Sequence, residues 1–145
     1  LLASSAASDV YKRQAIVLQI GDLSAVCMEE LDIILLLSNL LNNAIEALKE
    51  CENEKILRIK LELKQEEFLI SVQNSFEGDR KKNGELYTTT KKKDAELHGY
   101  GIKNIRNTAE KYGGFCQFDS LDSEFHAVVC IPMPEKNFVK KGKIM

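Results

Sequence analysis

The sequence predicts an α+β domain in which a mixed, mostly antiparallel sheet is covered by helices on one face. Three observations support this class: a long segment whose leucines recur at helical spacing, two consecutive segments in which apolar and charged residues alternate, and a second helical segment followed by two short apolar runs. Because helices and strands of this kind each present an apolar face, a two-layer α/β sandwich buries all of them together.

The first predicted elements are a short strand over 15–20 and a helix over 33–50. The strand is an apolar run, which by its pattern alone could also be a buried piece of helix. The helix is preceded by Asp32 as its N-cap, and its apolar residues are spaced so that they form one core-facing stripe. These apolar residues are Leu37, Leu40, Leu41, Ala44 and Leu48.

A hairpin is predicted next. Apolar and charged residues alternate over 57–64, and the alternation returns over 68–72, which is the period of strands with one face in water. The short segment 64–67 between them predicts a turn and antiparallel pairing. Asn74 continues the inward phase of the second strand, so one polar side chain is expected on the buried face.

The second half of the chain predicts one helix and two closing strands. Residues 76–97 are polar, lysine-rich and without period, and a segment of this length serves as a functional lid or stays mobile. A helix is expected over 101–112, with the two glycines that follow it as its C-terminal stop. The closing strands are expected near 115–118 and 125–131.

The chain has 145 residues and 44% hydrophobic content, which is the size of a single domain with one core. We expect this domain to span 15–134. Residues 1–14 are small, polar and aperiodic, and we interpret them as a leader that is non-native or disordered. Residues 135–145 form a basic tail.

Composition excludes several classes of protein. The formal net charge of -2 gives no global field that would attract nucleic acid or an anionic membrane. The longest apolar run, 33–37, is far shorter than the roughly 18 residues of a membrane span. The four cysteines form no C-x-x-C pair, which argues against zinc and against a disulfide framework. We expect reduced thiols in the cytosol, mostly in the core: Cys27, Cys51, Cys116 and Cys130.

The first helix carries a polar stripe. Asn39, Asn43 and Glu46 lie at i, i+4 and i+7, so they share one narrow arc. Asparagine is up to about 0.7 kcal/mol less favourable than alanine inside a helix, so its repeated use needs a reason. A magnesium ion would supply one, because Mg²⁺ bound to a nucleotide takes only one or two oxygens from the protein. The alternative is the solvated face of an amphipathic helix.

Two further features suit a nucleotide. Gly99 and Gly101 lie where the lysine-rich segment joins the second helix, and free amides in a first helical turn form an anion site. The alternative is a flexible turn. Asn74 ends a strand in the buried phase, where an adenine amino group would satisfy its oxygen, whereas the alternative is a strand-end cap. Neither histidine suits a phosphoacceptor, since His98 lies inside the glycine segment and His126 lies on a predicted strand.

These features in this order resemble a known family. Residues 39–47 (NLLNNAIEA) resemble the asparagine box of histidine kinases, and residues 98–105 (HGYGIKNI) resemble their second glycine box. Over about 15–134 the chain is similar to the ATP-binding domains of the GHKL superfamily, with the Bergerat-type fold. With Asn74-Ser75 and Thr89-Thr90-Lys91 included, it is most similar to the AgrC-like kinases that sense peptide pheromones.

The resemblance implies the ATP-binding catalytic domain of a sensor histidine kinase, with ATP and Mg²⁺ as cofactors. It implies that Asn43 ligates Mg²⁺, that Asn39 lies beside the phosphates and that Asn74 recognises adenine. The residues implied to contact phosphate are Lys91, Gly99, Gly101 and the amides of Ile102 and Lys103. In the hydrolysing branches of the superfamily, the position of Asn39 is a glutamate that activates water. An amide lacks that basicity, which favours phosphotransfer.

The implied phosphoacceptor is a histidine on a separate helical domain absent from this chain, and a response regulator would act after it. Any membrane attachment would lie in that missing part. Because dimerisation in the family resides there too, we expect this chain alone to be monomeric and to bind no nucleic acid. One departure leaves alternatives open: the usual Asp-x-Gly-x-Gly of the first glycine box is reduced to residues 74–78 (NSFEG). The alternatives are a non-catalytic nucleotide-binding or docking module and an anti-sigma-type serine kinase.

Overall fold

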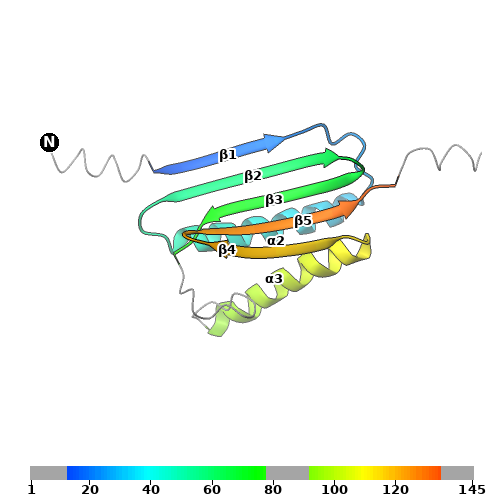
Figure 1. The fold of residues 1–145 in the computed structure, drawn as a ribbon. Coiled ribbons are helices and arrows are strands. Elements are labelled where there is room, and N and C mark those ends of the chain that lie inside the picture. The colour runs from blue at the N-terminus through cyan, green and yellow to red at the C-terminus, as the bar shows by residue number, and fades with distance from the viewer. Residues whose placement is uncertain (1–12, 78–91, 135–145) are drawn as a thin grey trace, which may run out of the picture.

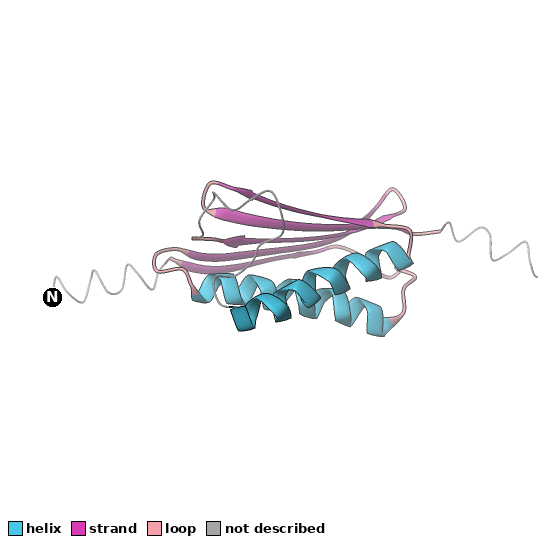
Figure 2. Ribbon diagram, turned by 90° about the horizontal axis from the view of Figure 1, so that it is seen from below, coloured by secondary structure: helices cyan, strands magenta, loops and turns pink. Residues whose placement is uncertain are grey.

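A computed structural model describes residues 13–77 and 92–134, with side chains in the second segment from Tyr100 onward. It shows a five-stranded sheet with two helices on one face, which confirms the predicted α+β sandwich (Figures 1 and 2). The elements are β1 (Gln14–Ile20), α2 (Glu30–Lys49), β2 (Lys55–Lys64), β3 (Glu67–Ser75), α3 (Lys92–Lys111), β4 (Phe115–Leu121) and β5 (Glu124–Pro132).

The sheet has the order β1-β2-β3-β5-β4. β1 pairs with β2 in parallel, and the other neighbouring pairs are antiparallel, so the sheet is mixed as predicted. The predicted hairpin turn is present at Gln65 and Glu66, whose φ angles are 51° and 63°. Both angles are in the left-handed region that two-residue hairpin turns require.

The core lies between the sheet and the two helices. β3 contributes alternate residues to it, and Asn74, 2% exposed, continues their phase as predicted. α2 contributes Leu36, Leu40 and Ala44, so its buried stripe lies nearer Leu36 than the predicted stripe, in which Leu37 and Leu48 are only partly buried. The length of α2 and its mean hydropathy of 1.4 would allow it to cross a membrane, but core helices share both properties.

The start of α2 differs from the prediction. The helix begins at Glu30, and Glu29 is its N-cap residue, whose carbonyl accepts the backbone N–H of Asp32 at 3.0 Å. Asp32 is therefore not the N-cap, because it lies inside the first turn. Its carboxylate instead accepts hydrogen bonds from Lys111 and Tyr112 at the far end of α3.

The end of α3 is as predicted, but its start is not. Gly113 has a φ of 74°, its N–H donates to Glu110 O at 2.9 Å, and the N–H of Gly114 donates to Ala109 O at 2.9 Å. These bonds form a Schellman motif. The helix begins at Lys92 instead of residue 101, because residues 92–98 contain neither glycine nor proline. Residues 92–97 of the predicted lid are therefore helix, residues 76–77 are bonded to neighbouring segments, and residues 78–91 lie outside the described residues.

All four cysteines are free thiols. Cys51 and Cys130 are buried, which raises the pKa of both, and Cys116 is half-buried. Cys27 is exposed, so the expectation of core thiols holds for three of the four.

Candidate functional site

The structure brings Asn39 and Asn43 of α2 against Gly101 of α3. A Cβ added to Gly101 would lie 3.4 Å from Asn39 Oδ1, 3.4 Å from Asn43 Oδ1 and 3.9 Å from Asn43 Nδ2. The missing side chain of Gly101 thus lets α3 lie close to α2, and two amide oxygens converge on this glycine. These residues are 58 or more positions apart in the sequence, so only the packing of α2 on α3 unites them.

The orientation of Asn39 is fixed by its own helix. Its Nδ2 donates to Leu35 O at 2.7 Å, which directs the amide nitrogen along α2 and leaves Oδ1 on the side of α3. Both asparagines are half-buried, whereas Asn42 between them is exposed. Two neutral, hard oxygens that face the same glycine fit a magnesium ion that takes its other ligands from phosphate and water.

The remaining residues predicted to contact the phosphates belong to α3 or lie just before it. Ile102 is buried and Lys103 is exposed, both within α3. Because α3 begins at Lys92, the N–H groups of Ile102 and Lys103 lie in the helix interior, where such groups donate to carbonyls four residues earlier. The prediction that they are free first-turn amides is therefore wrong for this structure. Gly99 also lies within α3, and Lys91 lies outside the described residues.

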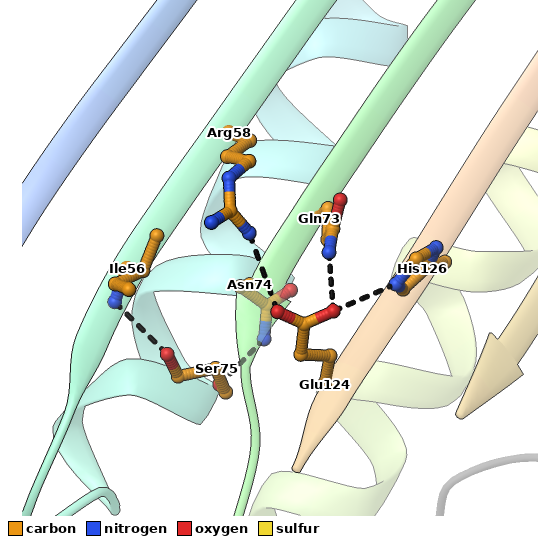
Figure 3. A network of polar contacts seen from close by, with 7 residues as sticks. All are labelled: Ile56, Arg58, Gln73, Asn74, Ser75, Glu124 and His126. Carbon is orange, nitrogen blue, oxygen red and sulfur yellow. Dashed lines mark hydrogen bonds and ion pairs between the residues drawn. The ribbon is translucent and has the colours of Figure 1, made fainter. Parts of the chain in front are cut away.

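Asn74 lies in the sheet, on the side of β3 that faces the helices. Its neighbours across the sheet are Leu57 and Phe125. Its Nδ2 donates to Ser75 O at 2.9 Å, and Ser75 Oγ accepts the N–H of Ile56 at 2.9 Å (Figure 3). The described hydrogen bond of Asn74 thus runs along its own strand, and not to Asn39 or Asn43.

Glu77 has a role that the sequence did not reveal. Its carboxylate accepts the backbone N–H of Glu52 at 3.0 Å and that of Asn53 at 3.2 Å. These two hydrogen bonds hold the pKa of Glu77 below its ordinary value. They attach the segment after Asn74 to the loop after α2. No local pattern predicts this contact, because both donors are main-chain groups.

A polar network lies on the open face of the sheet, opposite the helices. The Glu124 carboxylate accepts hydrogen bonds from Arg58 at 3.2 Å and from Gln73, and it lies 3.3 Å from His126 Nε2 (Figure 3). Partial burial alone would raise the pKa of Glu124, but these partners together lower it. His126 is half-exposed on β5 and pairs with Gln73 on β3, so it lies on a strand as predicted.

Comparison with known proteins identifies the family. A family model described as the GHKL domain matches residues 28–132, which is more than half of the 145 residues. No match was found among curated proteins.

Solved structures share the fold. The catalytic domain of histidine kinase ThkA, in a nucleotide-free form, aligns with a TM-score of 0.65 and 20% identity over 90% of this chain and 89% of that chain. Acinetobacter baumannii histidine kinase AdeS aligns with a TM-score of 0.62 and 16% identity over 90% of this chain and 61% of its own.

A third similar structure is the Erythrobacter litoralis EL346 blue-light activated histidine kinase. It aligns with a TM-score of 0.65 and 12% identity over 94% of this chain and 42% of its own. This chain therefore spans less than two thirds of AdeS and of EL346, and these likenesses are likenesses of fold. From the family match and the shared fold together, the chain belongs to the GHKL domain family, whose members bind ATP.

Proposed function

We propose that this chain is the ATP-binding catalytic domain of a two-component sensor histidine kinase. It would transfer the terminal phosphoryl group of Mg-ATP to a histidine on a separate helical domain. The observation that carries the proposal is the convergence of Asn39 Oδ1 and Asn43 Oδ1 on Gly101. The match to the GHKL domain and the fold of ThkA support it.

The residues take the following roles in this proposal. Asn43 ligates Mg²⁺ through Oδ1, and Asn39 contacts the phosphates beside it. The phosphates approach α3 at Gly101, where no side chain intervenes, and Gly99 lies two residues before it. Asn74 presents its Oδ1 to the adenine amino group while its Nδ2 remains bonded to Ser75 O. Lys91 contributes a positive charge for the phosphates.

The chemistry follows from what these side chains lack. Neither asparagine has the basicity to take a proton from water, so the site positions and neutralises but does not activate a hydrolytic water. When bound, Mg-ATP supplies the phosphoryl group and a cation that offsets its charge. The protein's contribution is to hold the phosphates in line with an incoming histidine.

Calorimetric titration tests nucleotide binding. We expect wild-type protein to bind ADP and a non-hydrolysable ATP analogue in a Mg²⁺-dependent manner, and Asn43→Ala to weaken that binding at least tenfold, roughly the effect of one lost charge-assisted contact. Asn42→Ala is the matched control, because Asn42 is an exposed neighbour on the same helix and should leave affinity unchanged. Absence of binding to a well-folded sample would refute the proposal.

A second candidate is a docking module of the same fold that does not transfer phosphate. The segment after β3 favours the docking module. Where the family has its first glycine box, the Glu77 carboxylate accepts the backbone N–H groups of Glu52 and Asn53. The discriminating experiment restores a helical phosphoacceptor domain N-terminal to the chain and measures autophosphorylation. Incorporation of phosphate on histidine supports the kinase. Binding without transfer supports the docking module, and phosphoserine on a partner protein would instead indicate an anti-sigma-type serine kinase.

The cellular setting is part of the same proposal. The resemblance to AgrC-like kinases suggests a cytoplasmic domain of a membrane-bound sensor for a peptide pheromone, and hence a role in quorum sensing. Phosphate would pass from the acceptor histidine to a response regulator. The chain alone would be monomeric, which sedimentation analysis would test.

A further inference from the structure

A polar cluster lies at the end of the α2–α3 interface that is farthest from Gly101. Asp32 Oδ2 accepts hydrogen bonds from Lys111 Nζ at 2.8 Å and from the Tyr112 hydroxyl. The Tyr112 oxygen in turn accepts the backbone N–H of Glu29 at 3.1 Å. The Asp32 side chain is only 15% exposed. This cluster therefore joins the first turn of α2 to the last turn of α3.

The cluster and the asparagine pair lie along the same helix faces. Asp32 and Asn39 are seven residues apart on α2, which is about two turns, so both face α3. Gly101 and Tyr112 are eleven residues apart, which is about three turns and about 16 Å of helix. One interface thus has directional polar contacts at one end and the Asn39–Asn43–Gly101 site nearer the middle of both helices.

Interdigitated apolar side chains resist sliding of α3 along α2, but polar contacts define its position more sharply. Hydrophobic contacts are non-directional, whereas hydrogen bonds weaken steeply when their distance or angle changes. A slide of one residue moves a helix by about 1.5 Å, and an error of about 1 Å in a catalytic arrangement is enough to reduce activity strongly. Because a helix is stiff along its axis, fixing its end at Tyr112 fixes Gly101 as well.

We propose that Asp32 and Tyr112 are positioning residues, which set the axial register of α3 on α2 and thereby keep Gly101 against Asn39 and Asn43. Neither residue belongs to the proposed nucleotide site. The expected effect on nucleotide affinity rests on the proposed function. The structural content of the inference is independent of that function and is tested without nucleotide.

The first experiment uses the nucleotide-free protein. The side-chain amide resonances of Asn39 and Asn43 are recorded by NMR in wild type and in Tyr112→Phe, which removes only the hydroxyl. We expect both resonances to shift. Glu124→Gln is the control, because it disturbs a comparable carboxylate network on the opposite face of the sheet and should leave them in place. Asp32→Asn provides a second variant if Tyr112→Phe fails to fold.

The second experiment measures affinity for Mg-ADP by calorimetry, far below the melting temperature. We expect Tyr112→Phe and Asp32→Asn each to bind about three- to tenfold more weakly, the effect of one hydrogen bond. The double variant should lose less than the sum of the two single losses, because both changes disturb the hydrogen bond between Tyr112 and Asp32. Added sucrose should restore stability without restoring affinity, which a purely stabilising role would not show.

The outcomes separate the two proposals. Unmoved asparagine resonances together with unchanged affinity would overturn the positioning role. Shifted resonances in a protein that binds no nucleotide would support the register role and refute the proposed function instead.

Discussion

Gly114 shows how one missing side chain allows two strands to meet. A Cβ at this position would lie 2.2 Å from the carbonyl oxygen of Cys130 and 3.0 Å from Cα of Ile131. Both atoms belong to the backbone of β5, which is held on either side by β3 and β4. No flexible side chain is present to move aside, so glycine is required by the close approach of the main chain.

We expect Gly114→Ala to reduce the free energy of unfolding by about 1–3 kcal/mol, the usual cost of overpacking. Urea denaturation measures it. Gly21→Ala is the matched control, because its Cβ would lie 3.6 Å from Leu61 O, an ordinary contact. It should change stability by less than about 0.5 kcal/mol. Equal losses in the two variants would show that the close approach at Gly114 is not the cause.

At Gly101 we expect substitution by alanine to preserve stability but to impair nucleotide binding. A methyl group there meets the asparagine oxygens at 3.4 Å, which is a tolerable contact, and alanine is about 1 kcal/mol better than glycine inside a helix. We therefore expect Gly101→Ala to raise or preserve stability while it weakens nucleotide binding, because the methyl group would lie against the two amide oxygens proposed to hold Mg²⁺ and the phosphates. Denaturation and calorimetry on the same sample check both parts. Unchanged affinity would contradict the proposed site.

At the scale of the elements, the sequence predicted features that depend on local periodicity and missed those that depend on tertiary contacts. The hairpin over β2 and β3 was predicted because a period of two is a property of the strand itself. The start of α2 was misplaced because Asp32 resembles an N-cap in sequence, whereas its carboxylate binds residues about 80 positions away. Helix propensity over 92–98 extended α3 beyond the glycines that were expected to start it.

In the candidate site, too, the features set by local spacing could be predicted and those set by tertiary packing could not. The stripe of Asn39 and Asn43 could be predicted from helical spacing, because it depends only on the geometry of α2. That Gly101 is the residue opposite them follows from how two helices pack, which spacing alone does not give. Glu77 could not be found at all, because its partners are backbone amides that every residue possesses.

The contact between α2 and α3 predicts a dependence of stability on pH. Hydrogen bonds from Lys111 and then from Tyr112 hold the pKa of Asp32 below its ordinary value of about 3.9. A depressed pKa contributes stability above the unfolded value, and that contribution is lost as pH falls through the folded value. The stability margin of wild type over Asp32→Asn should therefore be constant near pH 6 and shrink below about pH 4.

The measurement is a series of urea denaturations of both proteins across that range. The same contact raises the pKa of Tyr112 and of Lys111, with Asp32 as the main cause in each. A raised pKa gives stability that is present below the unfolded value and lost as pH rises through the folded one. A margin that stays constant from pH 3 to pH 6 would show that Asp32 is not held as a carboxylate by its partners.

At the scale of the whole molecule, the helices protect one face of the sheet but not its β1 edge. β1 carries no charged residue and no proline over Gln14–Ile20, and it exposes Ile16 (72%), Leu18 (61%) and Ile20 (59%). Strand edges are normally protected by lysine, proline or a bulge, because unpaired backbone groups invite pairing with other chains. The described part of the protein shows none of these features at β1.

We expect Ile16→Lys to reduce concentration-dependent self-association without loss of stability, because the side chain is already exposed. Light scattering over a concentration series measures the association. Leu31→Lys on α2 is the control, since Leu31 is 76% exposed but lies on no strand edge. If both lysines reduce association equally, general apolar exposure and not the strand edge is responsible.

The interleaving of core and site residues along α2 constrains how such a chain can evolve. Leu36, Leu40 and Ala44 pack under the sheet, while Asn39 and Asn43 alternate with them on the side of α3. One inserted or deleted residue among them would rotate everything beyond it by about 100° about the helix axis. A change in the number of residues is therefore far less disruptive in a loop of this chain than within this helix.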